Sequence, residues 1–247
     1  MRRGKMGFWF RLAVLIVKPW ATVLTRRRWS GQEHIPISGP VIVAVNHISY
    51  VDPFLVAHFV YEAGRLPRFL AKVAVFDLPV GGRILRGAGQ IPVHRYSADA
   101  DAALSSAAAA LRVGECVVIY PEGTVTQDPA YWPMHFRTGV ARLAFLTGAP
   151  VVPVGQWGAQ HIFGRDRRLH LLPPRVIEFR AGPPMDLSSY ALRSDAGGLA
   201  LREATDLVLR EIRQLVGRLR EETPPAGFFD PRTTLAVDDD DQHQRSA

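Results

Sequence analysis

Continuously apolar stretches alternate along the chain with stretches of mixed polarity. Three short apolar runs, bounded by turn-forming residues, are typical of strands buried on both faces, and they cover residues 41–45, 116–120 and 151–155. Shorter or more mixed runs predict further strands at 68–75, 90–94 and 175–180. Apolar and charged residues alternate in 175–180, which favours a strand at the edge of a sheet.

Between these runs, apolar residues recur with helical spacing, and the start and stop signals agree with it. Asp99 and Asp101 open an alanine-rich segment that ends at Gly114. Similar patterns predict helices over 52–63, 99–113, 138–147 and 195–220. Strands that alternate with helices predict an α/β fold, with a mixed, largely parallel sheet flanked by helices. In such a sheet, functional side chains lie in the loops that follow the strands.

The first 30 residues differ from the rest in charge. Of the 30 basic residues in the chain, eight lie in residues 1–30, where there is no acid, and this leaves 22 against 23 acidic residues elsewhere. Arg11 and Lys18 lie seven positions apart and share one helix face, with apolar and aromatic residues on the other. We therefore predict a helical segment that lies on an anionic membrane surface, with Pro19 bending or ending the first helix.

Other readings of this segment fit less well. The charges interrupt the run before it reaches the length of about 18 residues that a membrane-spanning helix needs. A signal peptide should have an unbroken apolar region and a small-residue cleavage site. A nucleic-acid-binding arm should interleave its basic residues with stacking aromatics rather than aliphatics. The expected partners therefore include membrane lipids and no nucleic acid, and the expected location is the cytoplasmic face of the cell membrane, as a peripheral or monotopic protein.

The chain divides into three parts by composition. Residues 1–30 form the basic segment, residues 31–222 the α/β domain, and residues 223–247 a polar tail with an acidic run, which we expect to be disordered. The single cysteine, Cys116, excludes an intrachain disulfide and a multi-cysteine zinc site. It lies in an apolar run and is expected to be a buried thiol.

The segment after the first apolar run, Asn46-His47-Ile48-Ser49-Tyr50-Val51-Asp52-Pro53, could carry chemistry. A strand end can hold His47 at a fixed position, and a turn can return the Asp52 carboxylate to one imidazole nitrogen, which leaves the other nitrogen to accept a proton. Because no Gly-x-Ser-x-Gly element is present, His47 would deprotonate a substrate hydroxyl directly. Alternatively, Asp52-Pro53 is only a helix start and His47 an ordinary loop residue. No third ligand at a recognisable spacing supports a metal site.

Two further segments are candidates for binding. Glu122, Gly123 and Thr124 follow the run at 116–120, where exposed amides and a hydroxyl could hold a phosphate and Glu122 could orient a hydroxyl or hold the loop. Arg95 follows a short predicted strand and could pair with a phosphate. Taken alone, the first could be an ordinary turn, and the second a surface arginine.

Together these segments resemble the glycerolipid acyltransferase superfamily, in particular bacterial 1-acylglycerol-3-phosphate acyltransferases. The resemblance spans roughly residues 31–187. Its blocks are matched in order by Asn46-His47-x-Ser49-x-x-Asp52, by Gly89-x-Ile91-Pro92-Val93-x-Arg95, by Pro121-Glu122-Gly123-Thr124 and by Val152-Pro153-Val154, with Phe136-Arg137-Thr138-Gly139 between the last two.

The resemblance implies transfer of a fatty acyl chain to lysophosphatidate, in phospholipid biosynthesis, without an acyl-enzyme. His47 would be the general base and Asp52 its partner. The expected substrate-binding residues are Asn46, Ser49, Lys72, Arg95, Glu122, Gly123 and Thr124. No metal or cofactor is expected, and the acyl donor, acyl-CoA or acyl carrier protein, would be a co-substrate.

One residue departs from the pattern of the family. The third block usually continues with arginine, and this chain has Val125. Lys72, Arg95 or Arg137 could replace the missing guanidinium, or the acceptor could be another lysophospholipid or a glycolipid. A non-enzymatic lipid-binding module and a hydrolase that releases the acyl chain to water are the other hypotheses.

Overall fold

The computed structural model describes residues 7–93, 99–193 and 197–229. Seven strands form one sheet: β1 (Thr25–Ser30), β2 (Val41–Val45), β3 (Pro67–Lys72), β4 (Ile91–Val93), β5 (Cys116–Ile119), β6 (Val151–Trp157) and β7 (Arg175–Ala181). The helices are α1 (Phe8–Leu24), α2 (Asp52–Glu62), α3 (Gly81–Gly87), α4 (Asp99–Arg112), α5 (Gly139–Thr147), α6 (Ser188–Ala191) and α7 (Gly197–Arg220). The order of strands across the sheet is β1-β7-β6-β2-β5-β3-β4.

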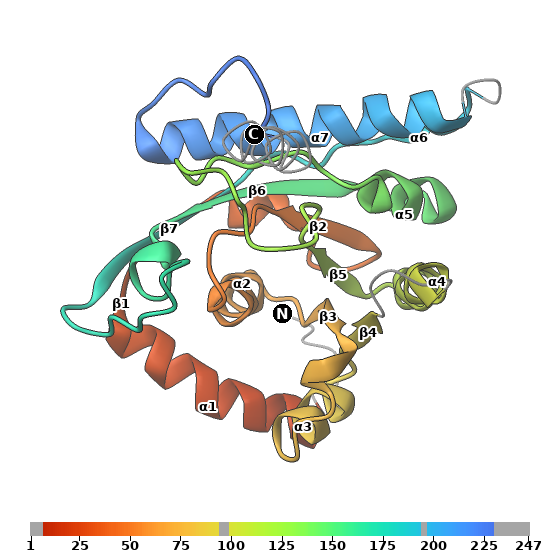
Figure 1. Ribbon diagram of the computed structural model, residues 1–247. Helices are drawn as coiled ribbons and strands as arrows, with labels where there is room; N and C mark the ends of the chain where they lie inside the picture. The colour runs from red at the N-terminus through yellow and green to blue at the C-terminus, as the bar shows by residue number, and fades with distance from the viewer. Residues whose placement is uncertain (1–6, 94–98, 194–196, 230–247) are drawn as a thin grey trace, which may run out of the picture.

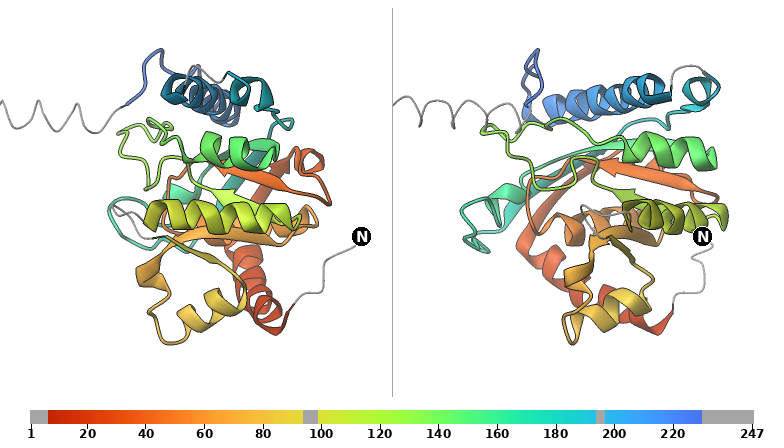
Figure 2. Two further views of the ribbon diagram at one scale, coloured as in Figure 1. Left: turned by 90° about the vertical axis from the view of Figure 1, so that its right-hand side faces the viewer. Right: turned by 45° about the vertical axis from the view of Figure 1, so that its right-hand side comes forward.

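All neighbouring strands are parallel except β6 and β7. The prediction of a mixed, largely parallel α/β sheet is therefore confirmed. Helices cover both faces, with α5 and α7 on one side and α1, α2 and α3 on the other (Figures 1 and 2). A strand that is covered by helices on both faces must be apolar throughout. The side chains of β2 accordingly divide between two cores: Ile42 and Ala44 face α4, α5 and α7, and Val41, Val43 and Val45 face α2.

The predicted edge position of 175–180 is wrong. β7 lies between β6 and β1, and the edge strand on this side of the sheet is β1, which lies within the segment predicted to be helical. Its arginines are exposed, as suits an edge strand that must not pair with another chain. Trp29 fixes this strand, because its ring packs edge-on against Phe59 and Phe179.

Of the two effects expected of Pro19, it does not end helix α1, which continues to Leu24. Proline has no N–H, so the carbonyl of Leu15 loses its helical partner there without ending the helix. The basic segment is therefore joined to the α/β body by a strand and is not a separate appendage. At the other end, the backbone of Phe229 accepts a hydrogen bond from His135 N at 3.0 Å, and Arg213 donates to the carbonyl of Pro225. Residues 230–247, the main part of the predicted tail, lie outside the described residues.

Gly155 allows α7 to approach the sheet closely. A Cβ at this position would lie 2.8 Å from Leu215 Cβ and 2.9 Å from the backbone nitrogen of Val216. The backbone of α7 would have to move to relieve such a contact, and the loss of packing would extend to the core beneath the helix.

We expect Gly155→Ala to lower the free energy of unfolding by about 2 kcal/mol or more, as overpacking of a rigid contact does. The matched control is Gly198→Ala in α7, where a Cβ meets no atom within 4 Å and the better helix propensity of alanine should keep or raise stability. Urea unfolding followed by circular dichroism measures both. Equal stability of the two variants would contradict this account of the contact.

Candidate active site

The carboxyl ends of β2 and β5 lie side by side, and this brings together the two segments singled out in the sequence. Asn46 fastens the end of β2 to β6: its side-chain oxygen accepts a hydrogen bond from Gln156 N at 2.8 Å, and its amide donates to Gln156 O at 3.2 Å. The side chain of Gln156 donates in return to the backbone oxygen of Asn46 at 2.6 Å. His47 therefore follows a rigid strand end.

The carboxylate of Asp52 is the centre of the turn after His47. One oxygen, Oδ2, lies 2.8 Å from His47 Nδ1 and accepts hydrogen bonds from Ile48 N at 2.7 Å and Ser49 N at 2.9 Å. Asp52 is fully buried at the first turn of α2, where the helix dipole favours a negative charge. An ionised carboxylate only accepts hydrogen bonds, so in this contact Nδ1 would be the donor, and Nε2 is the ring nitrogen that Asp52 does not contact.

The imidazole of His47 stacks on the ring of Tyr120, with centroids 4.2 Å apart and planes at 21°. Tyr120 in turn stacks on Phe69 of β3 at 6.3 Å. Burial raises the pKa of the Tyr120 hydroxyl well above its usual range, so this ring is neutral at physiological pH. The stack restricts rotation of the histidine, whose side chain is 14% exposed.

Glu122 lies behind His47 and not in front of it. Its carboxylate accepts hydrogen bonds from His47 N at 2.7 Å and Met134 N at 3.1 Å. The backbone oxygen of His47 accepts a further bond, from Thr126 N at 2.7 Å. The 120–126 loop thus holds both polar backbone groups of His47. Burial raises the pKa of Glu122 to about 8, although the hydrogen bonds from the two backbone N–H groups oppose this rise.

A cavity of about 800 Å³ opens in front of His47. Most of its wall is apolar and comes from α1, α2, α3 and β3, with Phe10, Val14, Ala57 and Leu85 among the lining residues. Its polar side chains include four cations, Lys18, Lys72, Arg137 and Arg142. Lys18 pairs with Glu62 at 2.7 Å, and Arg142 pairs with Asp101 at 2.8 Å.

Arg137 lies over the loop that follows β5. Gly123, with φ of +73°, leaves room for it, because a Cβ there would come within 3.1 Å of Arg137 Nε. The guanidinium therefore borders the same cavity as the imidazole of His47. Lys72 borders the cavity from the end of β3, which is parallel to β5.

The structure separates the predicted site residues into two groups. His47, Lys72 and Gly123 line the cavity, and Thr124 is half-buried outside the lining. Asn46, Ser49 and Glu122 are buried in hydrogen bonds to backbone groups, where Ser49 Oγ donates to Phe163 O at 2.6 Å. These three side chains position the loop and do not face the space in front of His47. Arg95 lies outside the described residues.

The sequence pattern indicates no role for Tyr120 beyond the end of the apolar run 116–120, and none for Thr126. His47 follows β2 and Tyr120 follows β5, so their stacking depends on the pairing of these two strands, which the sequence alone does not show. Val125 is buried, so its side chain is part of the core where the family pattern has arginine. Among the described residues, no cluster of three or more His, Cys, Asp or Glu could hold a metal ion.

Comparison with known proteins places the chain in a family. The family model described as "Acyltransferase" matches residues 26–157, which contain every sequence block named above. A chloroplastic 1-acyl-sn-glycerol-3-phosphate acyltransferase of Brassica napus is 28% identical over 153 residues, 60% of this chain and 43% of that protein. An uncharacterised protein of Mycobacterium leprae is 32% identical over 226 residues, 77% of this chain and 59% of that protein.

The chain thus spans about half the length of the curated relatives it matches. Among solved structures, a 1-acyl-sn-glycerophosphate acyltransferase of Thermotoga maritima has the same fold, with a TM-score of 0.65 and 21% identity over 89% of this chain and 84% of that one. The family model covers more than half of the chain and includes the His47–Asp52 pair. The chain therefore belongs to the acyltransferase family.

Proposed function

We propose that the protein transfers a fatty acyl group from an acyl thioester, either acyl-CoA or acyl carrier protein, to the free hydroxyl of lysophosphatidate, which yields phosphatidate in phospholipid biosynthesis. The observation that carries the proposal is the His47–Asp52 pair at the edge of a large apolar cavity. The relative from Brassica napus is named for this reaction, and family membership agrees with it.

In the proposed mechanism His47 is the general base. Nε2 takes the proton of the acceptor hydroxyl as its oxygen attacks the thioester carbonyl. The new ester bond forms, the carbon–sulfur bond breaks, and the imidazolium returns the proton to the leaving thiolate. Asp52 stabilises the imidazolium through Nδ1. No residue of the chain becomes acylated, and no cofactor is needed.

Asn46, Ser49 and Glu122 act in this scheme as positioning residues. Glu122 accepts a hydrogen bond from the backbone N–H of His47, and the backbone N–H of Thr126 donates one to the backbone oxygen of His47. Asn46 holds the end of the strand that precedes His47. Catalysis is sensitive to displacements of about 1 Å of the reacting groups, so these bonds matter although they touch no substrate.

The acceptor phosphate is proposed to bind Arg137, supported by Lys72, Gly123 and Thr124. Arg137 lies beside Gly123 in the loop after β5, the same loop in which Val125 replaces the family's arginine. A guanidinium can bind a phosphate with two parallel hydrogen bonds. Val125 is buried and supplies no guanidinium for a phosphate. The alternative acceptor is therefore another lysophospholipid or a glycolipid, with a different head group.

Association with the cytoplasmic face of the membrane is proposed through α1. Several of its large apolar side chains are exposed, among them Phe8, Leu15 and Trp20, and the helix forms part of the cavity wall. Within residues 7–93, 99–193 and 197–229 no helix combines the length and apolar character needed to cross a bilayer. The protein is accordingly proposed to be peripheral or monotopic, with its lipid substrates entering beside α1.

Replacing His47 with alanine should abolish transfer of a labelled acyl group from acyl-CoA to lysophosphatidate in mixed micelles. The rate of transfer should fall at least about a thousandfold, because the variant loses both the general base and the orientation that Asp52 gives to it. His161→Ala, which alters a histidine outside the cavity lining, is the matched control and should remain active.

Circular dichroism should show that both variants are folded. Full activity of folded His47→Ala would refute the mechanism. Labelled free fatty acid in place of phosphatidate would identify a hydrolase, and the absence of any turnover with all lysolipid acceptors would favour a lipid-binding module.

Arg137→Met should raise KM for lysophosphatidate at least about tenfold, because a charge-assisted bond to phosphate is lost, while kcat changes less. Arg142→Met is the matched control, since Arg142 borders the same cavity from α5, whereas Arg137 lies beside Gly123 in the loop after β5. An uncharged acceptor, monoacylglycerol, should not distinguish Arg137→Met from the wild type. Equal KM values for lysophosphatidate in the two variants would remove Arg137 from the acceptor site.

A further inference from the structure

The segment between Gly164 and Pro174 combines exposed basic and exposed apolar side chains. It connects the short helix Ala159–His161 to β7, and residues 165–170 are all exposed. It contains three arginines against one acid, Asp166. Leu169 and Leu172 are 56% and 75% exposed. Exposure of leucine side chains to water costs free energy. A partner that binds both the arginines and the leucines would therefore be favoured at this segment.

One of these arginines is already used within the protein. Arg165 donates to the carbonyls of Gln127 and Pro129 at 2.9 and 3.0 Å, and its guanidinium stacks over the ring of Tyr131. It anchors the segment to the loop after β5. Arg167 and Arg168 are exposed, and neither guanidinium is paired with a carboxylate among the described ion pairs.

The base of the segment is fastened to the loop that carries His47. Ser49 Oγ donates to the carbonyl of Phe163 at 2.6 Å, and the Phe163 ring packs edge-on against Tyr50 at 5.8 Å. The guanidinium of Arg167 lies 6.0 Å from the centre of the Tyr50 ring. Tyr50 itself is half exposed and lines the cavity in front of His47. The segment therefore contacts Tyr50, a residue that lines this cavity.

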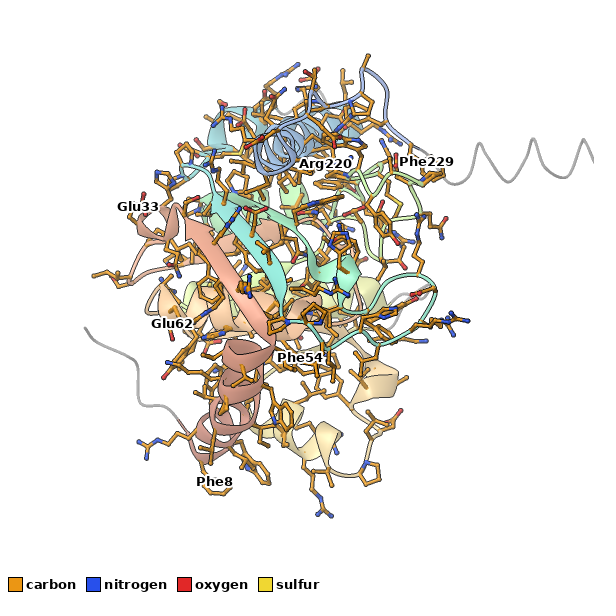
Figure 3. The ribbon with its side chains drawn as sticks, turned by 90° about the vertical axis from the view of Figure 1, so that its left-hand side faces the viewer. Phe8, Glu33, Phe54, Glu62, Arg220 and Phe229 are labelled. Carbon is orange, nitrogen blue, oxygen red and sulfur yellow. The ribbon has the colours of Figure 1, made fainter. Side chains whose placement is uncertain are left out.

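The same face of the molecule carries α1. Figure 3 shows Phe54 between α1 and the loop that precedes β7, with Phe8 at the far end of the helix. Phe54 is 54% exposed and also lines the cavity. Helix α7 lies on the opposite side of the sheet (Figure 1). Exposed apolar groups thus lie on α1 and on the 164–174 segment, with Phe54 between these two elements.

We infer that the 164–174 segment is a second membrane contact, in which Arg167 and Arg168 bind phosphates of anionic lipids while Leu169 and Leu172 enter the interface. The inference rests on the proposed membrane association of α1 and extends it. Basic residues gain free energy at an anionic surface, and apolar residues among them gain it from burial below the head groups. This pairing matches a lipid surface better than a nucleic acid, which offers no apolar layer beneath its phosphates.

Two contacts define the orientation of the protein on the bilayer, whereas contact through α1 alone would let the protein rotate about the axis of this helix. With α1 and the 164–174 segment both in contact, Tyr50 and Phe54 lie at the lipid surface between them. A lysolipid acceptor would then enter the cavity directly from the membrane, and its acyl chain would not cross water.

Sedimentation with lipid vesicles tests the inference independently of enzyme activity. The double variant R167Q/R168Q is compared with R202Q/R210Q, which removes the same charge from the exposed surface of α7. Vesicles contain phosphatidylcholine alone or phosphatidylcholine mixed with phosphatidylglycerol. On mixed vesicles R167Q/R168Q should bind about 30-fold more weakly than the wild type, since each basic residue contributes about fivefold, and R202Q/R210Q should bind normally.

On phosphatidylcholine alone, the two double variants should bind alike, whereas Leu169→Ser should weaken binding to both kinds of vesicle. Trp20→Ser tests the proposed role of α1 separately. Weaker binding of Trp20→Ser together with normal binding of R167Q/R168Q and Leu169→Ser would overturn the second contact and leave the first. Weaker binding of the loop variants with normal binding of Trp20→Ser would keep the loop contact and refute the role of α1.

Discussion

A single buried oxygen, Asp52 Oδ2, organises the site. It lies within 2.9 Å of three nitrogen donors, His47 Nδ1, Ile48 N and Ser49 N. Burial of a carboxylate is costly unless its hydrogen bonds are made, so the turn must keep the shape that supplies them. That shape fixes the tautomer and the direction of the imidazole, and it starts α2 at the same residue. The proposed chemistry at Nε2 and the fold of the loop therefore depend on the same contacts.

The sheet adds rigidity from its neighbouring strands. Because β2 lies between β5 and β6, both neighbouring strands hold the backbone around His47: Glu122 and Thr126 bond to it from the loop after β5, and Gln156 bonds to Asn46 from within β6. These groups were candidates for substrate contact or had no assigned role. Their burial shows that the fold uses these polar groups to hold His47, and the proposed recognition of the acceptor falls to cations at the cavity wall.

Local patterns in the sequence were enough to predict most elements, and the three buried runs became β2, β5 and β6 because continuous apolar stretches fit only strands covered on both faces. The edge of the sheet could not be predicted in this way. β1 has the polar sequence Thr25-Arg-Arg-Arg-Trp29-Ser30, and only its pairing with β7 makes it a strand. The His47–Asp52 contact was predictable from a short turn. The inward direction of Glu122 and the approach of Arg137 to Gly123 depend on contacts between distant segments, which spacing does not encode.

The most direct test of the central claim is the protonation of the two ring nitrogens of His47, measured by two-bond ¹⁵N–¹H correlation spectra of histidine-labelled protein at neutral pH and assigned with His47→Ala. The account predicts a proton on Nδ1 and a lone pair on Nε2, with loss of this tautomer in Asp52→Asn. A proton on Nε2 in the wild type, or a spectrum of His47 that Asp52→Asn leaves unchanged, would contradict the account.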